Sequence, residues 1–247
     1  MIGKHELIPS VAMQRQMHLW RFGHFGAPVI VFPSASGMAH EWEAHGMVDA
    51  VGDLIEAGKI KLYCTESNVA EAWTRKGGDP AWRIERHKAF ERYIARELVP
   101  YIREDCRSPD IRIASSGTSL GAFYSVNFTL KYPSLFGYAL CLSGNYDATW
   151  LTDGFSDSEI YFSNPVAYLP NLEGEELERV RRHADLVLVC GQGAWEDGNI
   201  ESTEQLADIL EAKGIRHERD LWGHDVEHAW IWWRRQARYH LGRAFGG

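Results

Sequence analysis

The stretch "IRIASSGTSLGAFYS" (residues 111–125) decides the fold class of this chain. Residues 117–121 within it are G-T-S-L-G, and they stand between an apolar run and an amphipathic segment. A G-x-S-x-G motif in this context places its serine on a tight, strained turn. Because the turn is tight, the residues two before and two after the serine must lack side chains. The hydroxyl of Ser119 is then raised above a sheet, and the N–H of Leu120 points toward a developing oxyanion. The motif therefore predicts a nucleophilic serine.

On both sides of this motif, short apolar runs alternate with segments of helical periodicity. Apolar runs typical of buried strands are residues 16–23, 28–33, 59–66, 111–115, 137–144, 184–191 and 215–222. Segments with helical spacing of apolar residues are 47–58, 82–105, 121–133, 201–214 and 228–243. This alternation predicts an α/β fold with a mostly parallel central sheet covered by helices on both faces. The first two runs are expected to pair as opening strands.

One long segment, near residues 145–176, departs from the alternation. It is rich in Gly, Asp, Ser, Asn and aromatic residues. A segment of this length without regular structure is uncommon inside a compact domain unless it is functional. Because alternation resumes afterwards, we expect a short cap excursion or pocket wall within one domain spanning residues 1–247. Tyr146 and Trp150 in this excursion are expected to contact substrate.

An acid and a base for Ser119 are expected on loops after later strands, in the chain order serine, acid, histidine. The run "QGAWEDG" follows the apolar strand 184–191 and offers Glu196 and Asp197. The run "GHDVEH" follows the strand 215–222 and offers His224 and His228. The residues alone leave both choices open.

Several segments together resemble the Putative esterase branch of the α/β-hydrolase fold, which includes esterase D-like carboxylesterases and secreted mycolyltransferases. The resemblance rests on "GTSLGA", "VCGQGAWED", "HAWIWW", "FGAPVIVFPS" and "YFSNPVAYLPNL" and spans nearly the whole chain. It implies an α/β-hydrolase fold, and an enzyme that hydrolyses small acyl esters or transfers acyl groups without a cofactor.

The resemblance also implies roles for individual residues. Ser119 matches the family nucleophile. His228 matches the base, because tryptophans follow it at two and five positions, here Trp230 and Trp233. His224 lacks this spacing and is the second choice.

The acid and the oxyanion donors follow from the same resemblance. Counting from the Cys-Gly that ends the strand favours Asp197 as the acid, with Glu196 as the alternative. Leu120 supplies one oxyanion N–H. The second is assigned to Ala35, with Ser36 as the alternative, although "FPSASG" lacks an H-G-G signature.

Two other functions compete with the esterase. The run H-D-V-E-H (residues 224–228) fits the H-x-x-E-H pattern of inverted zinc proteases, but it requires both histidines on one helix. Gly223 and the polar run indicate a loop there, so no metal is expected. The other is a non-catalytic binding protein that has kept the fold.

Composition restricts the partners. The net charge of −8 argues against nucleic acid or an anionic membrane as partner. The resemblance implies a small-molecule ester as substrate. The four cysteines show no C-x-x-C spacing, and no run has the length of a signal peptide core or a membrane span. The chain is therefore expected to be cytoplasmic. Its oligomeric state stays open.

Overall fold

The computed structural model describes residues 3–35, 37–75, 79–152, 155 and 157–247. The strands are β1 Lys4–Ser10, β2 Arg15–Phe22, β3 Ala27–Phe32, β4 Ile60–Thr65, β5 Ile113–Thr118, β6 Phe136–Leu142, β7 Leu186–Cys190 and β8 His217–Leu221. The helices before the motif are α1 Glu41–Ala44, α2 Met47–Ala50, α3 Gly52–Glu56, α4 Pro80–Tyr93, the π-helix η1 Ile94–Leu98 and α5 Val99–Asp105. Those after it are α6 Leu120–Lys131, the 3-10 helix η2 Ala148–Leu151, α7 Ser158–Phe162, α8 Pro165–Tyr168, the 3-10 helix η3 Leu169–Asn171, α9 Gly174–His183, α10 Asn199–Ala212 and α11 Trp230–Phe245.

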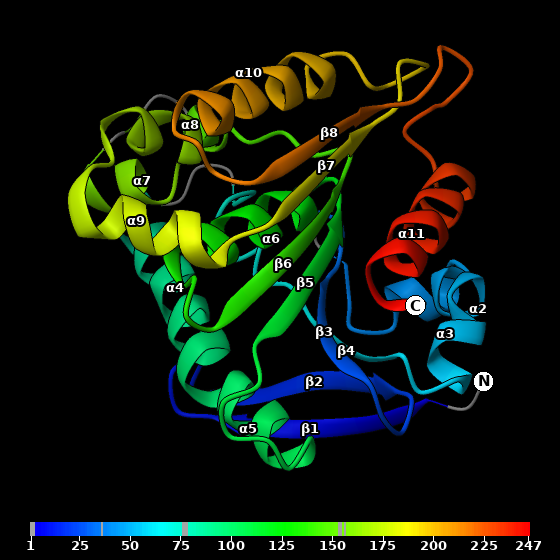
Figure 1. The fold of residues 1–247 in the computed structure, drawn as a ribbon. Helices are drawn as coiled ribbons and strands as arrows, with labels where there is room; N and C mark the ends of the chain where they lie inside the picture. Colours follow the sequence, from blue (N-terminus) through cyan, green and yellow to red (C-terminus); the bar gives the residue numbers. More distant parts are fainter. Residues whose placement is uncertain (1–2, 36, 76–78, 153–154, 156) are drawn as a thin grey trace.

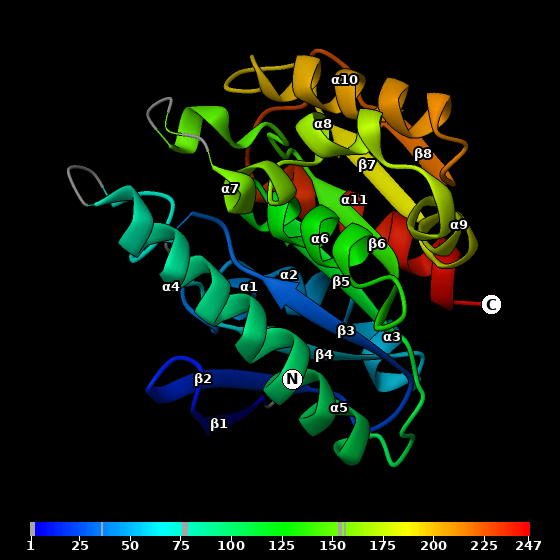
Figure 2. The ribbon, with the colours of Figure 1, turned by 90° about the vertical axis from the view of Figure 1, so that its left-hand side faces the viewer.

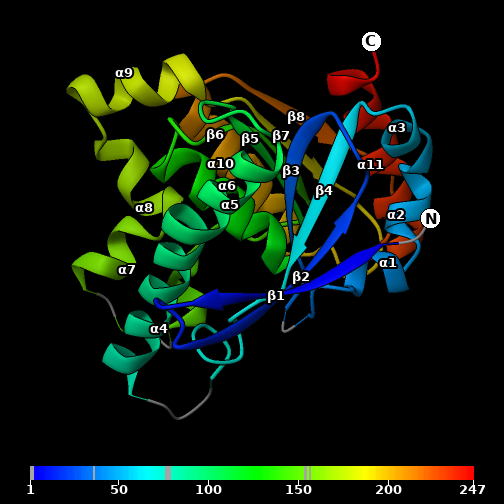
Figure 3. The ribbon, with the colours of Figure 1, turned by 90° about the horizontal axis from the view of Figure 1, so that it is seen from below.

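The strands form an eight-stranded sheet in the order β1-β2-β4-β3-β5-β6-β7-β8. From β4 to β8 along this order, all neighbours are parallel, whereas β2 runs antiparallel to both β1 and β4. The β1–β2 hairpin closes one end of the sheet (Figure 3). The expected pairing of the first two runs is wrong, because β4 inserts between β2 and β3 and pairs with both.

Helices cover both faces of the sheet (Figure 1). Helices α4, α6 and α10 lie on one face, and α2, α3 and α11 lie on the other. Strand β3 shows why both faces are apolar, since alternate residues of a strand point to opposite faces. Its Ile30 and Phe32 join the core beside α4 and α6, and its Val29 and Val31 join the core beside α11. The predicted parallel sheet covered on both faces is therefore confirmed.

The segment expected as one long helix, residues 82–105, is interrupted by a π-helical turn. Helix α4 leads into η1, which leads into α5, and Pro100 is in the first turn of α5. Proline has no N–H to donate to the carbonyl one turn earlier, and its ring crowds that carbonyl. A wider π-helical turn before the proline relieves this conflict without ending the helix.

The excursion after β6 consists of short helices rather than irregular chain. Aspartate side chains cap two of them: Asp147 accepts from the N–H of Thr149 at 2.9 Å, and Asp157 accepts from the N–H of Ile160 at 2.9 Å. The helices of the excursion lie beside α6 (Figure 2). Some of the polar residues that make this segment look irregular in the sequence are therefore caps of its short helices.

Within the described residues, no helix combines the length and apolar character needed to cross a lipid bilayer.

Candidate active site

Ser119 occupies a sharp turn between β5 and α6. Its backbone has φ +55° and ψ −121°, a conformation that is strained for any residue with a side chain. Its N–H donates to the carbonyl of Leu142, at the end of β6, over 2.8 Å. The side chain remains partly exposed. This is the geometry that the G-x-S-x-G motif predicts for a nucleophile.

The two glycines of the motif are required by close backbone contacts. A Cβ on Gly117 would lie 2.2 Å from the carbonyl carbon of Gly121, and a Cβ on Gly121 would lie 2.3 Å from the carbonyl oxygen of Phe32. Both obstacles are backbone atoms, which cannot rotate away. The glycines therefore let the first turn of α6 pack directly against β5 and the end of β3.

We expect Gly121→Ala to destabilise the fold, because the new methyl group meets the Phe32 carbonyl. Overpacking at such a contact should lower the free energy of unfolding by about 2 to 3 kcal/mol. In a chain of this length that corresponds to a Tm lowered by roughly 4–12 °C. Thermal unfolding checks this, with Gly247→Ala as the control, since a Cβ there meets nothing within 4 Å. Equal Tm values for the two variants would contradict the steric argument.

Both predicted oxyanion donors belong to segments that lie against each other. Leu120 begins α6, so its N–H has no partner within the helix. Ala35 is in the loop after β3, is exposed, and has φ +26°. This loop starts at Pro33, whose carbonyl oxygen would lie 2.7 Å from a Cβ on Gly121. The alternative donor, Ser36, lies outside the described residues.

His228, the candidate base, contacts a different carboxylate from the one expected. His228 Nδ1 lies 3.0 Å from Glu196 Oε2, and the Glu196 side chain is fully buried. Asp197 is exposed, and its prediction as the partner of His228 is wrong. The preceding Trp195 has φ +66°, a left-handed conformation that turns the chain so that the next side chain points inward. Counting along the sequence cannot detect this reversal.

Two further side chains donate to the Glu196 carboxylate, and a third donates to one of these two. Ser143 Oγ donates to Oε1 at 2.5 Å, Asn199 Nδ2 donates to Oε2 at 3.0 Å, and Trp233 Nε1 donates to Ser143 Oγ at 2.9 Å. Burial by itself raises the pKa of Glu196. The hydrogen bonds from His228, Ser143 and Asn199, together with the charge of His228, outweigh burial and lower this pKa below its usual range. The carboxylate is therefore kept ionised.

The same contacts join the serine turn to the histidine. Ser119 bonds to the Leu142 carbonyl, and the next residue, Ser143, bonds to Glu196, which bonds to His228. Our sequence reasoning missed Ser143 and Asn199. Their positions, directly after a strand and three residues after the acid, are the signals that could have found them.

Backbone hydrogen bonds join the loop after β7 to the loop after β8. The N–H of Gly193 donates to the carbonyl of Val226 at 2.8 Å, and the N–H of His228 donates to the carbonyl of Ala194 at 3.0 Å. The Trp233 ring packs edge-on against the imidazole of His228, with ring centres 4.7 Å apart. The tryptophan five residues after His228 thus orients the imidazole and also supports the buried acid through Ser143.

The zinc-protease pattern does not form. His224 is exposed on a turn, and α11 begins only at Trp230, so His224 and His228 are not on successive turns of a helix.

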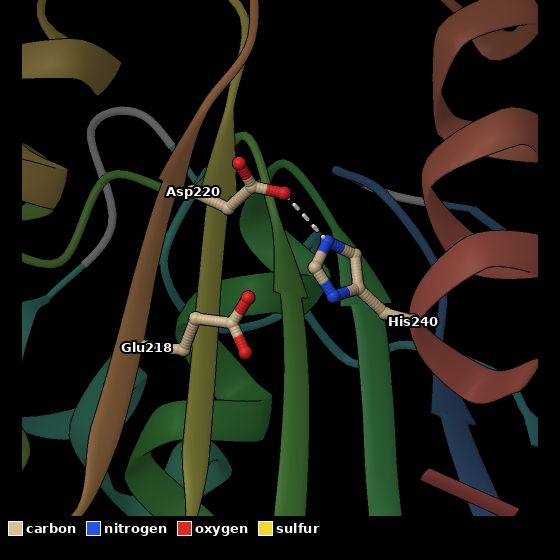
Figure 4. A group of neighbouring side chains, drawn as sticks. All are labelled: Glu218, Asp220 and His240. Atoms are coloured by element: carbon tan, nitrogen blue, oxygen red, sulfur yellow. Dashed lines mark hydrogen bonds and ion pairs between the residues drawn. The ribbon is translucent and has the colours of Figure 1, made fainter. Parts of the chain in front are cut away.

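A second possible metal group lies elsewhere, where Glu218 and Asp220 of β8 face His240 of α11 (Figure 4). Their ligand atoms lie within 4.8 Å of one another. Asp220 Oδ2 already accepts from His240 Nε2 and from Trp222 Nε1, both at 2.9 Å. Arg243 donates to both oxygens of Glu218, at 2.7 and 3.1 Å. The carboxylates therefore already have partners within the protein. The group is better explained as a set of contacts that joins α11 to β8 than as a cation site.

The structure tests only one of the two residues expected to contact substrate. Tyr146 is fully buried and packs in the core with residues of α6, β7 and α10, so its prediction as a pocket residue is wrong. Its N–H donates to Ser202 Oγ at 2.7 Å, which draws the chain into the core directly after β6. Trp150 is in η2, but its side chain lies outside the described part of the structure.

A large groove lies on another part of the molecule. It has a volume of about 1050 Å³ and lies between α2–α3 and α11, where Asp53 and Arg238 face each other. The described residues that line it include none of Ser119, Glu196 and His228. This groove is therefore separate from the candidate triad.

Comparisons with known proteins identify the family and the fold of the chain. A family model described as "Putative esterase" matches residues 26–242. No curated protein sequence matches the chain. Among solved structures, a ferulic acid esterase is similar with TM-score 0.75 and 16% identity, over 99% of this chain and 98% of that one. S-formylglutathione hydrolase FrmB from Staphylococcus aureus has TM-score 0.73 and 12% identity, over 98% and 95%. Mycobacterium tuberculosis MPT51 has TM-score 0.70 and 14% identity, over 100% and 98%. At such identities the likeness concerns the fold, and it confirms the predicted α/β-hydrolase architecture.

Proposed function

The chain belongs to the Putative esterase family, and from this premise we propose that it is a serine carboxylesterase using Ser119, Glu196 and His228. Family membership makes the chain a serine hydrolase that acts on ester bonds. The 3.0 Å contact between Glu196 and His228, on the loops after β7 and β8, carries the assignment of the triad. The chain order serine, acid, histidine is the order expected on this fold.

In the proposed reaction, His228 Nε2 takes the proton of Ser119 as its Oγ attacks the acyl carbon. The N–H groups of Leu120 and Ala35 hold the resulting oxyanion. His228 then gives this proton to the leaving alcohol, and the acyl group stays on Ser119. Water attacks the acyl-serine while His228 takes a proton from it, and the acid product leaves as the proton returns to Ser119 Oγ.

The surroundings of Glu196 support its role as the orienting acid. With Nδ1–H directed to Glu196, the lone pair on Nε2 of His228 is available to accept the serine proton. An ionised carboxylate also stabilises the imidazolium that forms, and more strongly in a buried site than in water. The lowered pKa of Glu196 keeps that charge in place at neutral pH.

We further propose a reducing compartment such as the cytoplasm. All four cysteines are free thiols, and Cys64, Cys141 and Cys190 are buried as small apolar groups.

Covalent labelling and ester hydrolysis test this proposal. A fluorophosphonate should label one serine per chain, because only an activated serine reacts rapidly. A panel of p-nitrophenyl acetate, longer p-nitrophenyl esters, methyl ferulate and S-formylglutathione should include at least one substrate hydrolysed at a rate abolished by the label. Added alcohol acceptors would reveal acyl transfer as a new ester product. No labelling and no turnover across the panel would instead support a non-catalytic binding protein.

A further inference from the structure

The loop after β3 carries the proposed oxyanion donor Ala35, and contacts on both sides of this residue fix it. Ser67 Oγ donates to the Ala35 carbonyl at 3.3 Å. The N–H of Gly37 donates to the Ser34 carbonyl at 2.7 Å, which closes the loop into a turn. An exposed turn with φ +26° at Ala35 therefore depends on its neighbours for its conformation.

The most specific of these contacts comes from Glu41, the first residue of α1. Its Oε2 accepts from the N–H of Ser34 at 2.7 Å, and its Oε1 accepts from Ser34 Oγ at 2.8 Å. One carboxylate thus fixes both the backbone and the side chain of the residue before Ala35. A Cβ on Gly37 would lie 2.3 Å from Glu41 Oε1, so the carboxylate fills space inside the turn.

The far end of α1 contacts the segment that carries the base. His45, directly after α1, stacks on Trp230 with ring centres 4.2 Å apart and ring planes 1° apart. Arg234 Nη1 donates to the His45 carbonyl at 3.0 Å. Trp230 is two residues after His228. Helix α1 therefore touches the oxyanion loop at one end and, at the other, the start of α11, directly after the loop that carries His228.

We propose that Glu41 is a positioning residue, which acts through Ser34 to hold the Ala35 N–H where the oxyanion develops. The inference rests on the proposed esterase function. A donor stabilises an oxyanion fully only when it is fixed before the reaction, because reorientation during the reaction costs free energy. Glu41 fixes the Ser34 N–H and Ser67 fixes the Ala35 carbonyl, so the peptide that carries the Ala35 N–H lies between two fixed points. The carbonyl of that peptide, which belongs to Ser34, accepts from the N–H of Gly37.

Glu41→Ala tests the proposal, and Glu41→Gln and Glu43→Ala serve as comparisons. Glu41→Ala should lower kcat by about 10- to 100-fold, while KM changes by less than about threefold, because the lost interaction acts on the transition state. Glu41→Gln should retain most of kcat, since the amide oxygen can accept from the Ser34 N–H and the amide nitrogen can donate to Ser34 Oγ. Glu43→Ala removes the same charge from the same helix and should match the wild type.

Rates are divided by the fraction of chains that a fluorophosphonate labels, so that loss of folded protein does not count as loss of kcat. A merely structural role would lower the labelled fraction and leave kcat per labelled site unchanged, and that result would overturn the proposal. Equal losses in Glu41→Ala and Glu41→Gln would also overturn it, because the amide preserves both contacts. A wild type that neither labels nor turns over any ester would instead refute the esterase function, and this inference with it.

Discussion

Ser119→Ala is expected to lower kcat for p-nitrophenyl acetate by about 10³- to 10⁶-fold, the range seen when a serine hydrolase loses its nucleophile. The substitution removes only Oγ. The contacts that hold the turn are made by backbone atoms, including the N–H that bonds to Leu142, so the fold should be retained. Steady-state kinetics on purified protein measures the loss, and the same preparation should no longer react with a fluorophosphonate.

Ser116→Ala is the matched control. It lies on β5, three residues before Ser119, and its buried Oγ has no hydrogen-bond partner within the described residues. Its activity should stay within about threefold of the wild type, in line with substitutions that touch no special feature. If Ser119→Ala keeps nearly wild-type activity, or both variants lose it equally, Ser119 is not the nucleophile.

The fold was predictable because its signals are local. Apolar runs, helical periodicity and the two glycines around Ser119 each act within a few residues, and the 2.2 Å between a Cβ on Gly117 and the carbonyl carbon of Gly121 shows the steric cause directly. The strand order was harder to predict from the sequence. Inserting β4 between β2 and β3 depends on contacts between distant segments, and the sequence of the two runs gives no sign of it.

The arrangement of side chains at the candidate site was predictable only in part, for a related reason. The tryptophan spacing behind His228 selects it because Trp233 contacts the imidazole and also bonds to Ser143. The choice between two adjacent carboxylates could not be made from spacing. It depends on the left-handed Trp195 and on partners as far apart as Ser143 and Asn199, which receive the Glu196 side chain. The misplacement of Tyr146 has the same origin, since an aromatic residue in a loop can equally fill the core.

Glu196→Gln is expected to lower kcat by about 10²- to 10⁴-fold, and Asp197→Asn should change it by less than about threefold. An amide at position 196 is neutral, so it no longer stabilises the imidazolium. Its NH₂ group can also donate to His228 Nδ1, which would place the imidazole proton on Nε2 and block that atom as a base. Asp197 is exposed, and its side chain makes no hydrogen bond or ion pair within the described part of the chain.

The stability of the two variants gives an independent readout of the same contact. The pKa of Glu196 in the folded protein lies below its ordinary value of 4.5, so its ionised form stabilises the fold above about pH 4.5. That contribution is lost as the pH falls through the lowered pKa. The Tm difference between wild type and Glu196→Gln should therefore be largest at neutral pH and shrink below pH 4.5, whereas Asp197→Asn should follow the wild type throughout. A larger kcat loss in Asp197→Asn than in Glu196→Gln would restore Asp197 as the acid, and it would mean that the buried Glu196–His228 contact serves the fold rather than the reaction.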